Sequence, residues 1–213
     1  PFYEDNEVKL LPTGREKYDD LFACVRSARD FIHMDYFKFQ QDSICRALFD
    51  ILTGKAREGV EVRIVYDSFG NRFSDLPLRK PYLDSLRAAG IRIEEFDRVR
   101  FPWINHLRHR NHHKIAVIDG EVAYTGGMNV ADYYLRGKPR VGEWRDMHMK
   151  VHGPMVNGYE RVFEDMWWRT TKERLDSTRY LSTGHRDGHT KMAMVERVPK
   201  KSGKAIRETY CIA

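Results

Sequence analysis

Three side chains with complementary chemistry lie close together in the middle of this 213-residue chain. His112 and Lys114 are separated by one residue, and Asn129 follows a pair of glycines further along. An imidazole can attack phosphorus or transfer a proton near neutral pH. An ammonium and a carboxamide can hold the non-bridging oxygens of a phosphate. The three groups would therefore suit chemistry on a phosphate ester, although a basic strand end beside an ordinary hairpin could produce the same spacing.

The residues around this trio predict a β-hairpin. Residues 114–118 are apolar and β-branched after the lysine, which is typical of a buried strand. Asp119 and Gly120 predict a two-residue type I′ turn, because both types tolerate positive φ. Residues 121–125 form the predicted return strand, and the glycines at 126–127 end it.

The predicted hairpin brings the three side chains together. Side chains two apart on a strand point to the same face, so His112 and Lys114 share one face. Asn129 approaches the same place from across the hairpin, after the return strand ends. The strands thus predict a single site for an imidazole, an ammonium and a carboxamide.

The complete pattern resembles the HxKxxxxD…(G/S)xN signature of the phospholipase D superfamily. The matching residues are His112, Lys114, Asp119, Gly126, Gly127 and Asn129. The Trp-Arg-Asp-Met-His run at 144–148 and the Gly-Pro pair at 153–154 resemble the bacterial cardiolipin synthase branch. This likeness extends over residues 8–168 and implies a phospholipase D-like fold.

The resemblance implies a two-step reaction through a phosphohistidine, with neither a metal nor a cofactor. His112 is then the nucleophile or the acid/base partner of a second histidine, and the sequence leaves both roles open. Lys114 and Asn129 would bind the phosphate. Asp146 would hydrogen-bond the imidazole of His112 and select its tautomer; a surface aspartate is the alternative interpretation.

Asp119 belongs to the catalytic motif by resemblance, but its position argues against direct chemistry. It is an odd number of residues from His112, so an ideal strand would turn it to the opposite face. It also occupies the predicted hairpin turn. We therefore predict a structural role for Asp119 within the catalytic motif.

The charge balance favours anionic partners. The chain has 37 basic and 31 acidic residues, for a net charge of +6, which does not separate nucleic acid from anionic lipid. Residues 98–118 contain no carboxylate, four histidines and the aromatics Phe101 and Trp103. This segment suits the phosphate headgroups of an anionic membrane surface, with a solvated basic loop as the alternative. Its histidines fit no usual zinc spacing, so no metal site is expected.

Alternating predicted strands and helices indicate the fold class. We expect strands at 7–11, 31–39, 60–66, 91–96 and 144–151 besides the hairpin. We expect helices at 14–30, from 43 to near 54 or 59, at 78–89 and at 155–170, and a loop at 67–71. This alternation predicts an α/β layered sandwich with a central mixed β-sheet flanked by helices.

The expected domain organisation is a catalytic domain over residues 1–171, a linker or mobile segment at 172–207, and the start of a truncated second half at 208–213. No apolar run approaches the roughly 20 residues of a membrane span. The three cysteines are scattered and predict reduced thiols. The resemblance implies a longer protein held in the cell membrane by N-terminal helices, with a second catalytic half or a homodimer partner completing the site.

The leading functional hypothesis is phosphatidyl transfer between two phosphatidylglycerol molecules, giving cardiolipin and glycerol. A phospholipase D-type phosphodiesterase or nuclease is the first alternative. A nuclease would need a long basic groove, and only residues 98–114 are densely basic, so nucleic acid is not the expected partner. A catalytically silent membrane-surface binding module is the second alternative.

Overall fold

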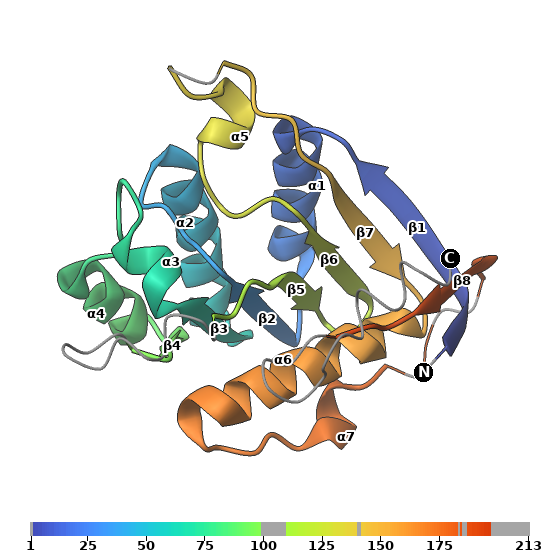
Figure 1. Cartoon of the computed structure of the whole chain (residues 1–213). Helices are drawn as coiled ribbons and strands as arrows, with labels where there is room; N and C mark the ends of the chain where they lie inside the picture. The colour runs from blue at the N-terminus through green and yellow to red at the C-terminus, as the bar shows by residue number, and fades with distance from the viewer. Residues whose placement is uncertain (1, 99–109, 140–141, 183, 185–186, 197–213) are drawn as a thin grey trace.

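One mixed β-sheet with helices on both faces forms the framework of the chain (Figure 1). The structure is a computed structural model that describes residues 2–98, 110–139, 142–182, 184 and 187–196. The sheet has eight strands in the order β4-β3-β2-β5-β6-β7-β1-β8. The strands are β1 (Phe2–Leu11), β2 (Phe31–Tyr36), β3 (Glu61–Asp67), β4 (Arg92–Phe96), β5 (Lys114–Ile118), β6 (Val122–Gly126), β7 (His148–His152) and β8 (Thr190–Ala193).

The sheet divides into a parallel part and an antiparallel part. Strands β2, β3 and β4 are parallel neighbours joined through helices, whereas β5, β6, β7, β1 and β8 pair antiparallel. Strand β5 joins the two parts by pairing antiparallel with β2. The prediction of a layered α/β sandwich with a mixed sheet is confirmed.

Helices α1 (Gly14–Ser27), α2 (Ser43–Arg57) and α4 (Lys80–Ala88) lie on one face of the sheet, which we call the α1 face (Figure 1). Helix α6 (Met155–Thr171) crosses the other face, which we call the α6 face. The Thr13 hydroxyl accepts a hydrogen bond from the Glu16 amide at the start of α1, and Asp42 caps α2 in the same way. These caps fix where both helices begin.

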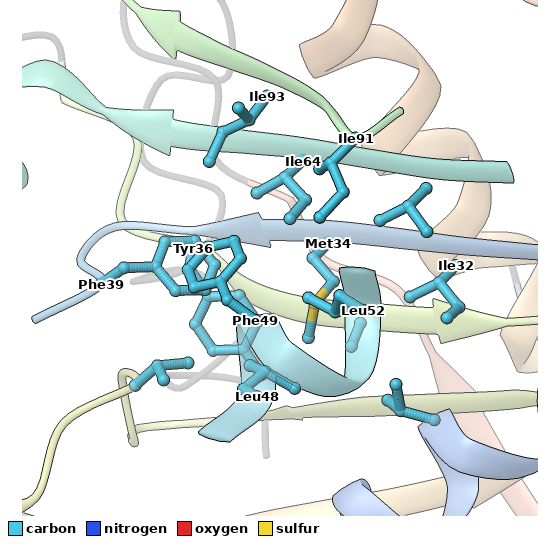
Figure 2. Packing of buried hydrophobic residues seen from close by; sticks show 14 of the residues in the cluster. Ile32, Met34, Tyr36, Phe39, Leu48, Phe49, Leu52, Ile64, Ile91 and Ile93 are labelled. Carbon is cyan, nitrogen blue, oxygen red and sulfur yellow. The ribbon is translucent and has the colours of Figure 1, made fainter. Parts of the chain in front are cut away.

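The main hydrophobic core fills the space between the α1 face and its helices (Figure 2). Ile32, Met34 and Tyr36 project from alternate positions of β2 and meet Leu48 and Leu52 of α2, and all five are buried. The intervening residues of β2 project to the α6 face. A strand buried on both faces explains why the sequence here is apolar without a clean alternation.

Some predicted elements differ from the structure in type or extent. Residues 67–71 were expected to be a loop, but α3 (Ser68–Arg72) forms because the Asp67 carboxylate accepts hydrogen bonds from the Phe69 and Gly70 amides. Strand β7 begins at His148 and not at residue 144, so Asp146 lies outside it. Helix α5 (Tyr133–Arg136) forms a single turn after the Gly-Gly segment.

Part of the predicted linker at 172–207 packs against the domain. Helix α7 (Ser177–Tyr180) buries Tyr180 to 3% exposure, and β8 pairs with β1 at the edge of the sheet. Parts of the segment interpreted as a linker thus contact the rest of the chain through α7 and β8. The predicted second-half strand at 208–213 lies outside the described residues.

Candidate active site

Four strand ends meet at one edge of the sheet. The start of β5 lies beside the end of β2, where Tyr36 pairs with Lys114. The end of β6 lies beside the start of β7, where Gly126 pairs with His148. Because β5 and β6 pair antiparallel, the segments before β5, after β6 and before β7 all leave the sheet at this edge.

His112 and Lys114 meet around the ring of Phe37, which follows β2. The imidazole of His112 is exposed and lies 4.8 Å from the Phe37 ring, centroid to centroid. Lys114 is only 4% exposed, and its ammonium lies 5.5 Å from the centre of the same ring while donating to the His112 carbonyl at 2.7 Å. The two predicted groups therefore lie together.

The electrostatic environment suits a neutral imidazole beside a weakly acidic ammonium. Partial desolvation of the ring and the neighbouring Lys114 cation lower the pKa of His112. Burial lowers the pKa of Lys114 to about 8, against the opposing effect of the Asp146 carboxylate. At neutral pH the His112 imidazole can therefore act as a nucleophile or accept a proton, and the Lys114 ammonium keeps its charge.

The structure brings Asn129 to the same edge. Asn129 is buried, its side-chain oxygen accepts from the Lys38 amide at 3.2 Å, and its amide nitrogen donates to the Tyr134 hydroxyl at 3.4 Å. Lys38 directly follows the Phe37 that contacts His112 and Lys114. The segment after β2 thus connects the carboxamide to the other two predicted groups.

Asp146 lies against the glycine pair. A β-carbon added at Gly127 would come within 1.9 Å of Oδ1 of Asp146, so only glycine leaves room for the carboxylate there. Oδ1 also accepts from the Met147 amide at 2.8 Å, and the carboxylate influences the charges of Lys114 and Lys17. Asp146 therefore acts on the charges of the lysines, but no hydrogen bond from its carboxylate to the His112 imidazole, the bond predicted from the sequence, is found among the described residues.

Two buried residues of this edge were missed from the sequence. Lys17 of α1 is fully buried, and its ammonium donates to the carbonyls of Met128 and Asn129, at 2.9 Å each. His148 is 1% exposed, and neither ring nitrogen has a partner among the described residues. A signal existed for Lys17, since it stands one helical turn before Leu21 on the buried stripe of α1.

Gly126 makes room for this second layer of residues. Its φ is 151°, and an added β-carbon would lie 2.7 Å from Nδ1 of His148 and 2.5 Å from the Met147 carbonyl. In the ladder between β5 and β6, Ile115 pairs with Thr125. Lys114 and Gly126 are the next residues toward the site, one on each strand, so they lie opposite each other on the α1 face. Because Gly126 has no side chain, the imidazole of His148 has space beside Lys114.

A carboxylate network holds the segment that leads into β5. Asp67 accepts from the Asn111 amide at 2.9 Å, and Asp35 accepts from the Asn111 side chain and from Nδ1 of His113 at 2.9 Å. Burial alone would lower the pKa of His113, but the Asp35 carboxylate raises it. These carboxylates end or follow strands of the parallel part of the sheet, a position that could have marked them as candidates.

Asp119 lies at the opposite end of β5 from His112. Its φ is 53° and that of Gly120 is 66°, which confirms the predicted I′-type hairpin turn. Its carboxylate accepts from the amides of Arg29, Asp30 and Phe31 at 2.8–2.9 Å, where the chain enters β2. The five residues of β5 separate it from the site by roughly 17 Å, so any contribution to chemistry is indirect.

A cleft of about 1110 Å³ opens beside the site. Its walls come from residues 12–15 before and at the start of α1, from residues 134–137 and from residues 142–147, which include Asp146. Arg15 and Arg136 line it and are exposed, and Trp144 and Met147 are exposed to 37% and 53%. The cleft offers both cationic and apolar surface to a ligand.

Most of the predicted basic segment, including Phe101 and Trp103, falls in residues 99–109 and lies outside the described residues. Within the described part, Arg110 pairs with Asp67 at 3.5 Å and also with Asp97. No group of His, Cys, Asp or Glu side chains in the described ranges is arranged to hold a metal ion. No helix among those ranges is long and apolar enough to cross a membrane.

Sequence comparison relates the chain to cardiolipin synthases. Residues 21–167 match the family described as "Cardiolipin synthase, PLD-like domain". The chain is 37% identical over 210 residues to the cardiolipin synthase of Listeria monocytogenes serotype 4a and 36% identical over 209 residues to that of Staphylococcus aureus strain N315. Each match covers 97% of this chain but only 43% and 42% of the relative, so the chain spans less than half the length of these proteins.

Solved structures share the fold at low sequence identity. The phospholipase D family member Nuc from Salmonella typhimurium superposes with a TM-score of 0.57 and 17% identity, over 80% of this chain and 99% of Nuc. The phosphatidylserine synthase of Haemophilus influenzae Rd KW20 superposes with a TM-score of 0.61 and 14% identity, over 81% of this chain and 41% of that protein. These likenesses establish the fold alone.

Proposed function

Because the chain belongs to the family of cardiolipin synthase phospholipase D-like domains, we propose that it forms one half of a phosphatidyl-transfer site. The reaction joins two phosphatidylglycerol molecules into cardiolipin and releases glycerol. The observation that supports this most is the match to cardiolipin synthases across 97% of the chain, which includes every residue that meets at the sheet edge.

In the proposed reaction, a ring nitrogen of His112 attacks the phosphorus of the first phosphatidylglycerol. A nitrogen–phosphorus bond forms, the bond from phosphorus to the glycerol oxygen breaks, and a second imidazole protonates the departing glycerol. The free hydroxyl of the second phosphatidylglycerol then attacks phosphorus, gives its proton to that second imidazole and releases His112. Lys114 and Asn129 stabilise the charge on the non-bridging oxygens.

The second imidazole must come from another copy of the motif. We propose that a second catalytic half, or a homodimer partner, supplies it across the sheet edge that carries His112. The same polypeptide would act at the cell membrane, where its phospholipid substrates reside. The cleft supports an amphiphilic ligand, since Arg15 and Arg136 suit an anionic headgroup and Trp144 suits a membrane interface.

The pH dependence of the reaction follows from three pKa values. His112 must be neutral to attack, and its pKa is lowered, so the rate should rise through a pH below 6.5. The second imidazole must be protonated to release glycerol, so the rate should fall again as the pH rises through the pKa of that imidazole. Lys114 must be charged to bind the phosphate, and its pKa is about 8 in the ligand-free protein. Substrate affinity should therefore weaken as the pH rises above about 8.

A lipid-product assay tests the proposal. The natural full-length protein would be incubated with phosphatidylglycerol vesicles, and cardiolipin, phosphatidic acid and glycerol would be measured. His112→Asn should reduce cardiolipin formation on the order of 10⁴-fold or more. His189→Asn, at an exposed position away from the site, is the matched control and should change nothing.

Three results would contradict the proposal. Phosphatidic acid as the product would favour the hydrolase, and cleavage of added nucleic acid would favour the nuclease. Full activity of His112→Asn would remove the proposed nucleophile.

A further inference from the structure

Lys17 is a buried cation that forms no salt bridge with a carboxylate in the part of the chain that the structure describes. Its side chain has no exposure, and its ammonium donates to the carbonyls of Met128 and Asn129 at 2.9 Å each. The ammonium also lies 4.9 Å and 5.2 Å from the ring centres of Tyr18 and Tyr36. Among the described residues, no ion pair includes Lys17.

Such an arrangement is expensive for a folded protein. A buried ammonium loses its hydration, and buried charges are normally paired with an opposite charge. Burial accordingly lowers the pKa of Lys17 well below its usual value, although the Asp146 carboxylate acts in the opposite direction. An apolar side chain at this position would avoid the buried charge but would leave the Met128 and Asn129 carbonyls without this donor.

The surroundings of Lys17 contain more positive than negative charge. Lys17 and Lys114 are both buried and close enough to repel, and Asp146 is the carboxylate that acts on both. The Asp35 carboxylate also acts on Lys114, but it is hydrogen-bonded to His113 and raises the pKa of that imidazole. When Lys17, Lys114 and His113 are protonated, the three cations exceed the two carboxylates by one charge. A phosphodiester carries one negative charge, so its binding beside Lys114 would balance the cluster.

We propose that Lys17 is a positioning residue of the phosphate site. It holds the backbone that carries Asn129 and supplies a second buried positive charge for the bound phosphodiester. This inference rests on the proposed function, which assigns Lys114 and Asn129 to the phosphate, and deepens it by adding a residue from α1.

His148 provides a probe of this charge. Its buried ring has no hydrogen-bond partner among the described residues, and it lies beside Gly126 at the site edge. Burial, followed by the charges of Lys17 and Lys114, lowers the pKa of His148 well below its usual value. The protonation of His148 therefore reports whether Lys17 acts as a charge or only as packing.

The first experiment measures the binding of inorganic phosphate to this chain by calorimetry at pH 7. Lys17→Met keeps the length of the side chain and removes its charge, and it should weaken phosphate affinity about tenfold or more, as expected for the loss of a charge-assisted contact. Arg26→Met removes an exposed cation from the other end of α1 and should change affinity less than about twofold.

A second variant separates this inference from the proposed function. Lys114→Met should abolish phosphate binding if the proposed site is correct. If Lys114→Met loses binding while Lys17→Met keeps it, the inference about Lys17 is wrong and the proposed site stands. If the native chain binds no phosphate, or Lys114→Met binds normally, the phosphate site itself is overturned.

Nuclear magnetic resonance of the imidazoles distinguishes charge from packing. In Lys17→Met the pKa of His148 should rise, because one of the two cations that suppress its protonation is gone. An unchanged His148 pKa in a folded variant would overturn the role of Lys17 as a charge.

If Lys17→Met does not fold, the native chain still provides a test. Saturation with phosphate should raise the pKa of the Lys17 ammonium, observed through its ε-methylene resonances, because the bound anion favours the charged form. A Lys17 signal that phosphate leaves unchanged would overturn the inference.

Discussion

Two buried histidines on neighbouring parts of the sheet have opposite surroundings. On the α6 face, both ring nitrogens of His33 are hydrogen-bonded: Nδ1 to Glu160 at 2.7 Å and Nε2 to Glu61 at 3.4 Å. The His33 ring also stacks on Phe163. At the site edge, His148 is equally buried, but neither of its ring nitrogens has a partner in the described part of the chain.

The pKa values follow these surroundings. Burial alone would lower the pKa of His33, but the Glu160 carboxylate outweighs it and the pKa is raised. Nothing offsets burial at His148, and the nearby lysines lower its pKa further. We infer that the buried pair of His33 and Glu160 holds α6 to the sheet, whereas the lysine charges at the site edge are available to a ligand.

The largest expected effect is on the paired side. Glu160→Ala removes the carboxylate that bonds His33 and leaves a buried imidazolium, which should cost about 3–5 kcal/mol of unfolding free energy. Urea denaturation at pH 6 would measure the loss. Asp165→Ala removes a partly exposed pair with Arg169 on the same helix and should cost less than about 0.5 kcal/mol. Equal losses in the two variants would break the comparison.

The site edge should be sensitive to shape. Gly126→Ala forces a β-carbon against the Met147 carbonyl and the His148 ring at a strained φ, and should cost roughly 2–3 kcal/mol. Gly59→Ala also has positive φ but meets no atom within 4 Å, so it isolates the backbone cost. Thermal denaturation compares the two variants; similar melting temperatures would show that space beside His148 is not limiting.

Asp119 tests whether a motif residue away from the site is structural. Asp119→Asn keeps one acceptor and loses the charge and the second acceptor for the amides that start β2. We expect a loss of about 1–2 kcal/mol in stability and near-native phosphate binding in the folded fraction. A variant that folds with native stability yet loses all chemistry in the full-length protein would contradict the structural role.

The smallest and most specific effect is on the pH dependence of stability. A raised pKa at His33 stabilises the fold fully below about pH 6.5, and this contribution is lost as the pH rises through the raised value. A lowered pKa at His148 has the opposite effect. The contribution of His148 to the stability of the fold is present above about pH 6.5 and is lost as the pH falls below it. His33→Gln should therefore weaken the fold more in acid, and His148→Gln should make it less sensitive to acid. Denaturation between pH 5 and 8 measures both slopes, and slopes of the same sign would refute the assignment.

Several features could be predicted from the sequence because they depend on neighbouring residues. The hairpin followed from the β-branched run at 114–118 and the Asp119-Gly120 turn, and the layered fold followed from the alternation of strands and helices. The spacing of His112, Lys114 and Asn129 was enough to group them, since a hairpin brings together residues that are close in sequence.

Other features depended on contacts that span most of the chain. Alternation did not reveal where β7 starts, because residues 144–147 continue the alternating pattern but line the cleft and lie outside the strand. The segment at 172–182 has few apolar residues, yet Tyr180 packs onto Phe31 from far along the chain. Composition alone does not reveal such a contact.

The sequence by itself determined which residues could perform the chemistry, and the tertiary structure decided what surrounds them. Lys17 is ninety-seven residues from Lys114 in sequence, and only the packing of α1 on the sheet brings the two cations together. A lysine on a helical stripe is ordinarily solvated; its burial against the Met128 and Asn129 carbonyls depends on the fold, because desolvation and charge act through space and not along the chain.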